Sequence, residues 1–356
     1  MEHKDFVNLL REYREIIWPI IEKNLEKIVD FEKVCQPKEK YQCLVDYHQK
    51  IYETYPKRKG KYFRPCMVML TGEAMGAPRE SLLNAAAAQQ LSEEWILIHD
   101  DIEDDSAQRR GEATLHKMYG EELAINAGDA LHILMWQMLQ DNRKIIGDKK
   151  TFAIMEEFCK MLNRTVLGQT IEIKWAQENK KDLTDDDILL VLESKTGYYT
   201  VAGPMREGAI IAGATTEELD KIYEFGKLTG YCFQIKDDLL DLTSDFCGQK
   251  KQCGNDIYEG KRTIMLAHLM RTIKGNDKEK LEKIMTKTRQ EKGCAEVDWV
   301  IEKMREYGSL DYADKLMNKF AVEASDYFKK ELGFLKESPA RSYLEYLPEF
   351  LTNRDH

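Results

Sequence analysis

The chain has 356 residues, of which 33% are charged, and a formal net charge of −10. The negative charge argues against nucleic acid as a partner, because nucleic-acid-binding surfaces are basic. No apolar run approaches the roughly 18 residues of a membrane-spanning helix, and residues 1–30 carry too many charges for a signal peptide. We therefore expect a cytoplasmic protein without an integral membrane segment.

The composition favours a single all-α domain over residues 1–356. The chain contains only 8 prolines, and its long stretches rich in Ala, Leu, Glu, Lys and Met favour helix throughout. No linker rich in proline, glycine or serine interrupts them. The 8 cysteines lack the spacing of a zinc site or a disulfide framework, so we expect reduced thiols.

The N-terminal part predicts two helices followed by a basic patch. Apolar residues recur at helical spacing over residues 4–29, and a second helix is expected over 40–54 before Pro56 interrupts the pattern. The patch, K-R-K-G-K-Y-F-R-P, covers residues 57–65. Its proline suits the first turn of a new helix, and helix N-termini attract anions. Taken alone, the patch fits a solvated loop equally well.

The next predicted helix, over residues 79–103, ends in an acidic motif of the pattern D-D-x-x-D. The motif consists of Asp100, Asp101 and Asp104. This spacing allows the three carboxylates to share one helix face, where they repel one another unless divalent cations lie between them. Mg²⁺ is the leading candidate, because it bridges carboxylates to substrate phosphates. Arg109 and Arg110 follow one turn later, and arginine is well suited to phosphate oxygens.

The same pattern returns at Asp237, Asp238 and Asp241. It lies in the last of four long predicted helices, which cover residues 122–140, 149–177, 186–212 and 216–243. A third acidic run, T-D-D-D-I at 184–188, is interpreted as structural, because Thr184 suits a helix N-cap and aspartates stabilise the positive end of a helix. The two D-D-x-x-D motifs differ from this run because apolar residues flank them.

Seven motifs in this order resemble those of the trans-isoprenyl diphosphate synthases, the polyprenyl synthetase family. They are G-K-Y-F-R-P at 60–65, D-D-I-E-D with R-R-G at 100–111, G-D-A-L at 128–131, G-Q at 168–169, K-T-G at 195–197, F-Q-I-K-D-D-L-L-D at 233–241 and G-N-D-I-Y-E-G-K at 254–261. The resemblance runs from about residue 57 to the C-terminus and is less clear over residues 1–56. It implies an all-α bundle of helices around a central substrate cavity.

The resemblance also implies an activity. Members of this family are Mg²⁺-dependent prenyltransferases that join isopentenyl diphosphate to an allylic diphosphate, with three Mg²⁺ ions per site held by the six aspartates, and they form homodimers. Two alternatives are a class I terpene cyclase and a non-catalytic subunit of a heteromeric synthase. A cyclase has little use for the G-K-Y-F-R-P cations, and such subunits usually lose aspartates or lysines. All six aspartates, Lys195 and Lys261 are present, which favours catalysis.

The roles of single residues follow from the same resemblance. The residues expected to bind the substrate diphosphates are Lys61, Arg64, Arg109, Arg110, Lys195 and Lys261, and Gln169 is expected to bind substrate by facing the pocket. Thr196 and Gln234 are expected beside the developing carbocation, where they complete the catalytic group with Lys195 and Lys261. Gly168 either lets a substrate approach closely or is a helix-packing contact, and the sequence leaves both open. Arg354 is a candidate for closing over the site.

Product length in the family is limited by bulky residues upstream of the first aspartate motif. Trp95 and Ile96 lie five and four residues before Asp100, and Ser92 lies one turn earlier. A bulky aromatic residue at the fifth position alone resembles the pattern of enzymes that form a C20 product. Geranylgeranyl diphosphate is therefore the expected product, with farnesyl diphosphate as the alternative. If Trp95 does not limit product length, it is a residue of the hydrophobic core.

One position departs from the family pattern. Glu93 lies seven residues before Asp100, where the family usually has histidine or glutamine in contact with isopentenyl diphosphate. A carboxylate repels a diphosphate unless it is protonated or paired, here with Lys61 or Arg64. We therefore expect Glu93 to form a salt bridge and to weaken the binding of isopentenyl diphosphate.

Overall fold

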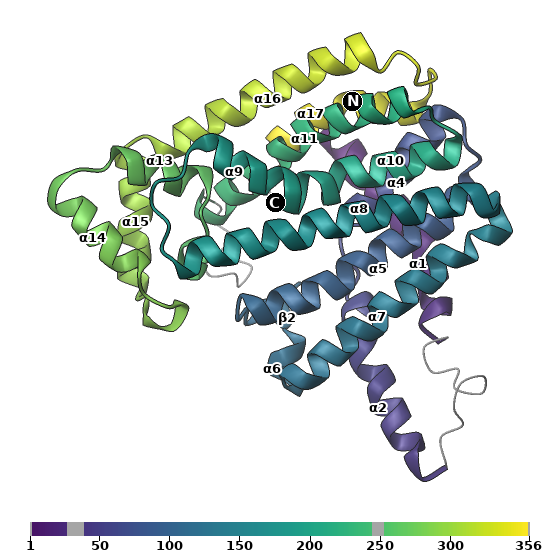
Figure 1. Ribbon diagram of the computed structural model, residues 1–356, viewed down its shortest axis with the longest axis horizontal. Helices are drawn as coiled ribbons and strands as arrows, with labels where there is room; N and C mark the ends of the chain where they lie inside the picture. Colours follow the sequence, from purple (N-terminus) through teal and green to yellow (C-terminus); the bar gives the residue numbers. More distant parts are fainter. Residues whose placement is uncertain (1, 27–38, 244–252, 355–356) are drawn as a thin grey trace. The chain divides into compact units, whose positions relative to one another are not determined.

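The computed structural model describes residues 2–26, 39–243 and 253–354 (Figure 1). Contacts between residues group the chain into two compact units, which we describe separately. Unit 1 contains Met1–Glu157, Pro204–Thr215 and Lys336–Arg341, and unit 2 contains Phe158–Gly203, Thr216–Leu335 and Ser342–His356. The single domain expected from the sequence stays a prediction.

The fold is all-α, as predicted. The strands in the described part of the chain form one short antiparallel ribbon, in which β1 (Gln108–Arg109) pairs with β2 (Glu112–Ala113). Among the described residues, no helix is both long enough and apolar enough to cross a membrane. The six cysteines of the described ranges are free thiols, while Cys35 and Cys247 lie outside those ranges.

Unit 1 is built around α5. Its helices are α1 (His3–Leu25), η3 (Glu39–Tyr41), α2 (Gln42–Tyr52), α3 (Thr54–Lys57), α4 (Phe63–Met75), α5 (Arg79–Glu103), α6 (Leu115–Tyr119), α7 (Glu121–Asp141), the first part of α8 (Arg143–Gln177) and most of α10 (Gly203–Ala212). The alanine run 85–88 of α5 is fully buried. These small side chains let α1, α4 and α7 pack closely against α5. This packing fixes the end of α5, where the first aspartate motif lies.

Unit 2 is built around α11, which contacts η4 and α16; α11 and α16 are labelled in Figure 1. Besides the rest of α8, its helices are α9 (Asp185–Val191), η4 (Leu192–Ala202), α11 (Thr216–Thr243), α12 (Asn255–Glu259), α13 (Ile264–Thr272), α14 (Gly275–Met285), η6 (Arg289–Glu291), α15 (Cys294–Glu306), α16 (Ser309–Glu331) and most of α17 (Pro339–Asn353). α11 and η4 approach closely at two glycines, because a Cβ atom on Gly230 would lie 2.4 Å from the Cα atom of Gly197.

Most predicted helix boundaries are confirmed. α5 and α11 have the bounds expected from the sequence, and Thr184 is the N-cap of α9, with its hydroxyl accepting the backbone N–H of Asp187 at 3.2 Å. The long helix expected over 186–212 was wrong in detail, because a π-helix, η4, separates α9 from α10. Pro56 lies within the short helix α3, and residues 27–29 of the first predicted helix lie outside the described ranges.

Candidate active site

The first aspartate motif lies at the C-terminal end of α5, in unit 1. Asp101 is fully buried and accepts the guanidinium of Arg109, with Nε and Oδ1 2.9 Å apart, and the hydroxyl of Tyr55. Asp100 and Asp104 are partly exposed, and Asp100 lies 3.6 Å from Arg109. The expected common face is therefore formed by Asp100 and Asp104, whereas Asp101 is turned inwards and fixes the arginine. Tyr55 was not among the residues predicted from the sequence to belong to the site.

The β1–β2 ribbon carries the two arginines that follow the motif. Arg110 has a left-handed backbone, with φ of 55°, and its guanidinium donates to Glu94 Oε2 at 2.9 Å and to the carbonyl of Tyr55 at 3.0 Å. The basic patch meets this side chain at Gly60, where an added Cβ atom would lie 2.7 Å from Nη2 of Arg110. Burial raises the pKa of Glu94, and Arg110 opposes this shift.

Glu93 forms the salt bridge expected from the sequence. Its carboxylate lies 3.2 Å from Arg64 and 3.6 Å from Arg110. Arg64 is in the first turn of α4, as predicted, and Lys61 precedes that helix. Two of the cations predicted to bind a diphosphate therefore have carboxylate partners within unit 1.

An aromatic cluster lies upstream of the first motif. The ring of Trp95 stacks on His132 of α7 with centroids 4.4 Å apart and meets His99 edge-on at 5.7 Å. The indole N–H of Trp136 donates to Nε2 of His132 at 3.0 Å. Sequence reasoning did not assign His132 or Trp136, although their spacing of four residues places them on one helix face.

The other two predicted chain-length residues lie on the same helix as Trp95. Ile96 is partly exposed, and Ser92 is fully buried and donates its hydroxyl to the carbonyl of Gln89 at 2.7 Å. Ser92 therefore satisfies its polar group within α5, which is the usual way to bury a hydroxyl in a helix.

The second aspartate motif lies near the end of α11, in unit 2. Asp238 is buried and accepts from Lys261 Nζ at 2.8 Å and from Gln234 Nε2 at 2.7 Å. Asp241 accepts the backbone N–H groups of Asn255 at 3.2 Å and Asp256 at 3.0 Å. Burial raises the pKa of Asp238 to about 7, although Lys261 opposes the shift. Burial and Asp256 raise the pKa of Asp241 to about 8.

Two further residues contact this motif. Asp237 is exposed and pairs with Arg354 at 3.1 Å, and the guanidinium of Arg354 also lies over the ring of Phe233. Asp256, which sequence reasoning left unassigned, lies 3.5 Å from Nζ of Lys261. It belongs to the quoted motif G-N-D-I-Y-E-G-K, and only the fold reveals that its carboxylate faces this lysine.

Lys195 and Thr196 lie on the π-helix η4. The ammonium of Lys195 pairs with Glu172 of α8, a residue that sequence reasoning missed. A Cβ atom on Gly168 would lie 2.8 Å from the backbone nitrogen of Lys195, so Gly168 is a helix-packing contact. Gln169 follows it on α8, and Thr196 is partly exposed.

The carboxylates fit Mg²⁺ by their chemistry. Within the described ranges, no three carboxylate, histidine or cysteine side chains converge closely enough to hold a metal ion. Mg²⁺ needs no such cage, since it keeps several waters and binds through one or two carboxylates and substrate phosphates. The partly exposed pair Asp100 and Asp104 and the exposed Asp237 are hard oxygen donors of this kind.

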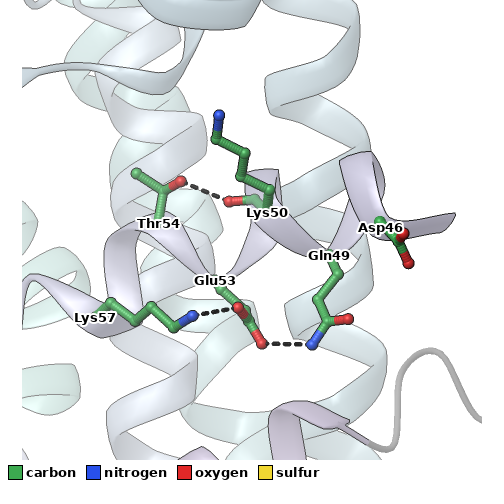
Figure 2. Close-up of a pocket in the computed structure, with 6 residues that line it drawn as sticks. All are labelled: Asp46, Gln49, Lys50, Glu53, Thr54 and Lys57. Carbon is green, nitrogen blue, oxygen red and sulfur yellow. Dashed lines mark hydrogen bonds and ion pairs between the residues drawn. The ribbon is translucent and has the colours of Figure 1, made fainter. Parts of the chain in front are cut away.

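A separate cavity of about 380 Å³ lies between α2 and α3 in unit 1, away from the predicted site residues. Figure 2 shows its six lining residues: Asp46, Gln49, Lys50, Glu53, Thr54 and Lys57. Gln49 and Lys57 both donate to Glu53, and Thr54 donates to the carbonyl of Lys50 at 2.8 Å. The polar groups at this cavity largely satisfy one another, and we assign it no role.

Comparison with known proteins identifies the family and the fold. Residues 45–304 match the model of the polyprenyl synthetase family. The chain belongs to this family. The match begins before residue 57 and ends before the C-terminus, so it differs at both ends from the extent expected from the motifs. Membership makes the chain a prenyltransferase of the trans-isoprenyl diphosphate synthase type.

The relatives differ in product length. The chain is 32% identical over 297 residues to the short chain isoprenyl diphosphate synthase of Methanothermobacter thermautotrophicus, covering 83% of this chain and 87% of the relative. It is 30% identical over 299 residues to the geranylgeranyl diphosphate synthase of Methanosarcina mazei, covering 83% and 86%. It is also 30% identical over 296 residues to the octaprenyl diphosphate synthase of Escherichia coli, covering 83% and 86%.

A solved structure has the same fold. The geranylgeranyl pyrophosphate synthetase from Pyrococcus horikoshii aligns with a TM-score of 0.81 and 27% sequence identity, covering 98% of this chain and 99% of that one. In this chain, the fold carries one aspartate motif with its cations in unit 1 and the other with its cations in unit 2.

Proposed function

We propose that this prenyltransferase condenses isopentenyl diphosphate with allylic diphosphates in a Mg²⁺-dependent reaction and releases geranylgeranyl diphosphate. The observation that carries the product length is the stack of Trp95 on His132, with ring centroids 4.4 Å apart. Two stacked rings form a more rigid barrier to the growing prenyl chain than one ring does, because each ring restricts the rotamers of the other. The geranylgeranyl diphosphate synthase among the relatives supports the same product.

In this proposal, unit 2 binds the allylic diphosphate. Lys195 and Lys261 contact its phosphate oxygens, with Gln169 nearby, and stabilise the charge that develops as the carbon–oxygen bond breaks. Thr196 and Gln234 present oxygen atoms to the resulting carbocation. Mg²⁺ would be held by the accessible aspartates of the two motifs, Asp100 and Asp104 in unit 1 and Asp237 in unit 2, and would supply further positive charge to the leaving group.

Unit 1 binds isopentenyl diphosphate in this proposal. Lys61, Arg64 and Arg110 hold its diphosphate, and Arg109, oriented by the buried Asp101, is a further guanidinium suited to phosphate oxygens. The homoallylic double bond attacks the cation, and loss of a proton to the released diphosphate completes the five-carbon extension. No side-chain nucleophile is required.

The test is an incubation of the purified chain with Mg²⁺, labelled isopentenyl diphosphate and each of dimethylallyl, geranyl and farnesyl diphosphate. Chromatography of the dephosphorylated alcohols is expected to show a C20 alcohol as the end product with all three starters. A C15 end product would contradict the proposed chain length. Cyclic hydrocarbons formed without isopentenyl diphosphate would indicate a cyclase, and an undiminished rate in EDTA would contradict the metal requirement.

We also propose that the chain acts as a homodimer with three Mg²⁺ ions per site, in keeping with the family pattern. Light scattering coupled to size exclusion is expected to give twice the chain mass of 41.5 kDa. A mass equal to one chain under turnover conditions would contradict the dimer. The cytoplasmic location stays a prediction.

A further inference from the structure

The further inference concerns the crossing of α8 and η4 in unit 2. Gly168 and Glu172 are four residues apart on α8, so they lie on one face of the helix. A Cβ atom on Gly168 would lie 2.8 Å from the backbone nitrogen and 2.9 Å from the Cβ atom of Lys195. The backbone of α8 therefore touches η4 at the lysine that the proposed function assigns to the allylic diphosphate.

One turn further along α8, Glu172 faces the end of the same lysine. Its carboxylate pairs with the ammonium of Lys195, and the two side chains are 14% and 24% exposed. Lys261 acts on the same carboxylate from another segment of unit 2. Burial alone would raise the pKa of Glu172, but Lys195 and then Lys261 lower it below its ordinary value. Glu172 is therefore an ionised, largely shielded carboxylate that is paired with Lys195 and close enough to Lys261 for that lysine to lower its pKa.

A lysine is poorly suited to hold a fixed direction by itself. Its four-carbon side chain is flexible, and ordering it costs rotamer entropy when the ligand arrives. A carboxylate on a rigid helix restricts that freedom in advance, and groups held in this way before binding are a general feature of precise sites. The close packing at Gly168 fixes the distance between Glu172 and the backbone of Lys195, so the restriction is built into the helix crossing.

We propose that Glu172 is a positioning residue that acts through Lys195 and directs its ammonium at the allylic diphosphate. This inference rests on the proposed function and deepens it, because it names a carboxylate that serves one of the two substrates. Glu172 does not contact the reacting atoms. A buried pair that only stabilises the fold would affect both substrates alike, so the two roles predict different kinetics.

The test is a double-mutant cycle with Glu172→Gln and Lys195→Met. Glu172→Gln is expected to lower kcat/KM for the allylic diphosphate by roughly 10- to 100-fold, because a catalytic group displaced by about 1 Å can slow a reaction by this much. KM for isopentenyl diphosphate is expected to stay within about twofold. In the Lys195→Met background, Glu172→Gln is expected to cause no further loss, because the two residues act as one unit.

The matched control lies on the same helix. Glu157 of α8 is also a buried glutamate paired with a cation, since it accepts Nε of Arg206 at 2.8 Å in unit 1. Glu157→Gln is expected to lower the melting temperature and to leave both KM values unchanged. Loss of activity in this variant equal to that in Glu172→Gln would overturn the inference.

Two other results would also overturn it. The first is a kcat/KM for the allylic diphosphate in Glu172→Gln that equals that of the wild type. The second is an equal loss of kcat/KM on adding Glu172→Gln to the wild type and to Lys195→Met. If circular dichroism shows that Glu172→Gln does not fold, the same cycle with Glu172→Asp applies, with a smaller loss that also vanishes without Lys195. A wild-type chain that forms no prenyl product would refute the proposed function, and the inference with it.

Discussion

At the scale of single residues, we propose that the Glu93 carboxylate competes with isopentenyl diphosphate for Arg64 and Arg110. Its carboxylate lies 3.2 Å from Arg64 and 3.6 Å from Arg110, and all three side chains are largely shielded from solvent. A diphosphate that binds these arginines must compete with this carboxylate. The family's usual neutral residue at this position would leave the guanidinium groups available to the substrate.

Glu93→Gln is therefore expected to lower KM for isopentenyl diphosphate by about 3- to 10-fold, equivalent to a binding gain of up to about 1.4 kcal/mol. KM for the allylic diphosphate should not change. Initial rates over a range of isopentenyl diphosphate concentrations measure this directly, with Glu80→Gln, an exposed change at the other end of the same helix, as control. An unchanged KM in Glu93→Gln would refute competition by Glu93.

Glu207 of α10 makes stability depend on pH. It is fully buried, and neither carboxyl oxygen has a hydrogen-bond partner in the described part of the chain. Burial and, secondarily, Glu157 raise the pKa of Glu207 well above its ordinary value of 4.5. The folded chain therefore binds one proton more than the unfolded chain at pH values between 4.5 and the folded pKa.

The free energy of unfolding should accordingly fall as pH rises through this interval, by up to about 1.4 kcal/mol per pH unit from this group. Glu207→Gln copies the protonated shape and removes the titration. Urea unfolding at pH 5 to 8 is expected to show a flatter pH dependence and greater stability at pH 8 for the variant. Parallel curves for variant and wild type would mean that Glu207 is ionised in the folded chain.

At the scale of helices, the predicted boundaries succeeded where local pattern determines structure. α5 and α11 begin and end as expected, because their apolar periodicity and flanking residues are local signals. The π-helix η4 was not predicted, because it depends on tertiary packing. There the backbones of Gly197 and Gly230 nearly touch, and a π-helix widens the turn that carries Lys195. Nothing in the spacing of the apolar residues indicates that widening.

Gly168→Ala tests this packing. Alanine gains about 1 kcal/mol over glycine in a free helix, but here its Cβ atom would overlap the backbone of Lys195. Overpacking of this kind costs about 1–3 kcal/mol, so we expect a net loss of stability and reduced kcat. Thermal unfolding and kinetics of Gly168→Ala measure both effects.

Gly333→Ala is the control for that substitution. Its φ lies outside the left-handed region, and no atom of the described residues, its two chain neighbours aside, lies within 4 Å of an added Cβ. We expect its stability and kinetics to remain those of the wild type. Equal behaviour of the two variants would contradict the packing role of Gly168.

At the scale of the whole molecule, an anionic chain acts on anionic substrates. The net charge of −10 opposes their approach, and local cations must outweigh it: Arg109 and Arg110 in unit 1, Lys195 and Lys261 in unit 2. The order of motifs made these residues predictable. Their carboxylate partners Glu94, Glu172 and Asp256 were not predicted. Each pairs with its cation only because the folded chain brings the two side chains together, and local sequence does not show this.

The same reasoning applies to the aromatic cluster. Trp95 was predictable from its distance to Asp100, whereas His132 comes from another helix and meets Trp95 only through the packing of α5 on α7. Trp136 belongs to the cluster through its hydrogen bond to His132. The central claim is that this cluster ends the growing chain at C20. If it does, removal of the Trp95 ring must leave room for a longer prenyl chain.

The most direct test compares the end products of the wild type and Trp95→Ala, formed from farnesyl diphosphate and excess labelled isopentenyl diphosphate with Mg²⁺. We predict a C20 alcohol from the wild type and alcohols of C25 or longer from the variant after dephosphorylation. Ser309→Ala, a change in a buried residue of unit 2 far along the chain, should keep the C20 product. A C20 product from Trp95→Ala would contradict the account, as would any wild-type product other than C20.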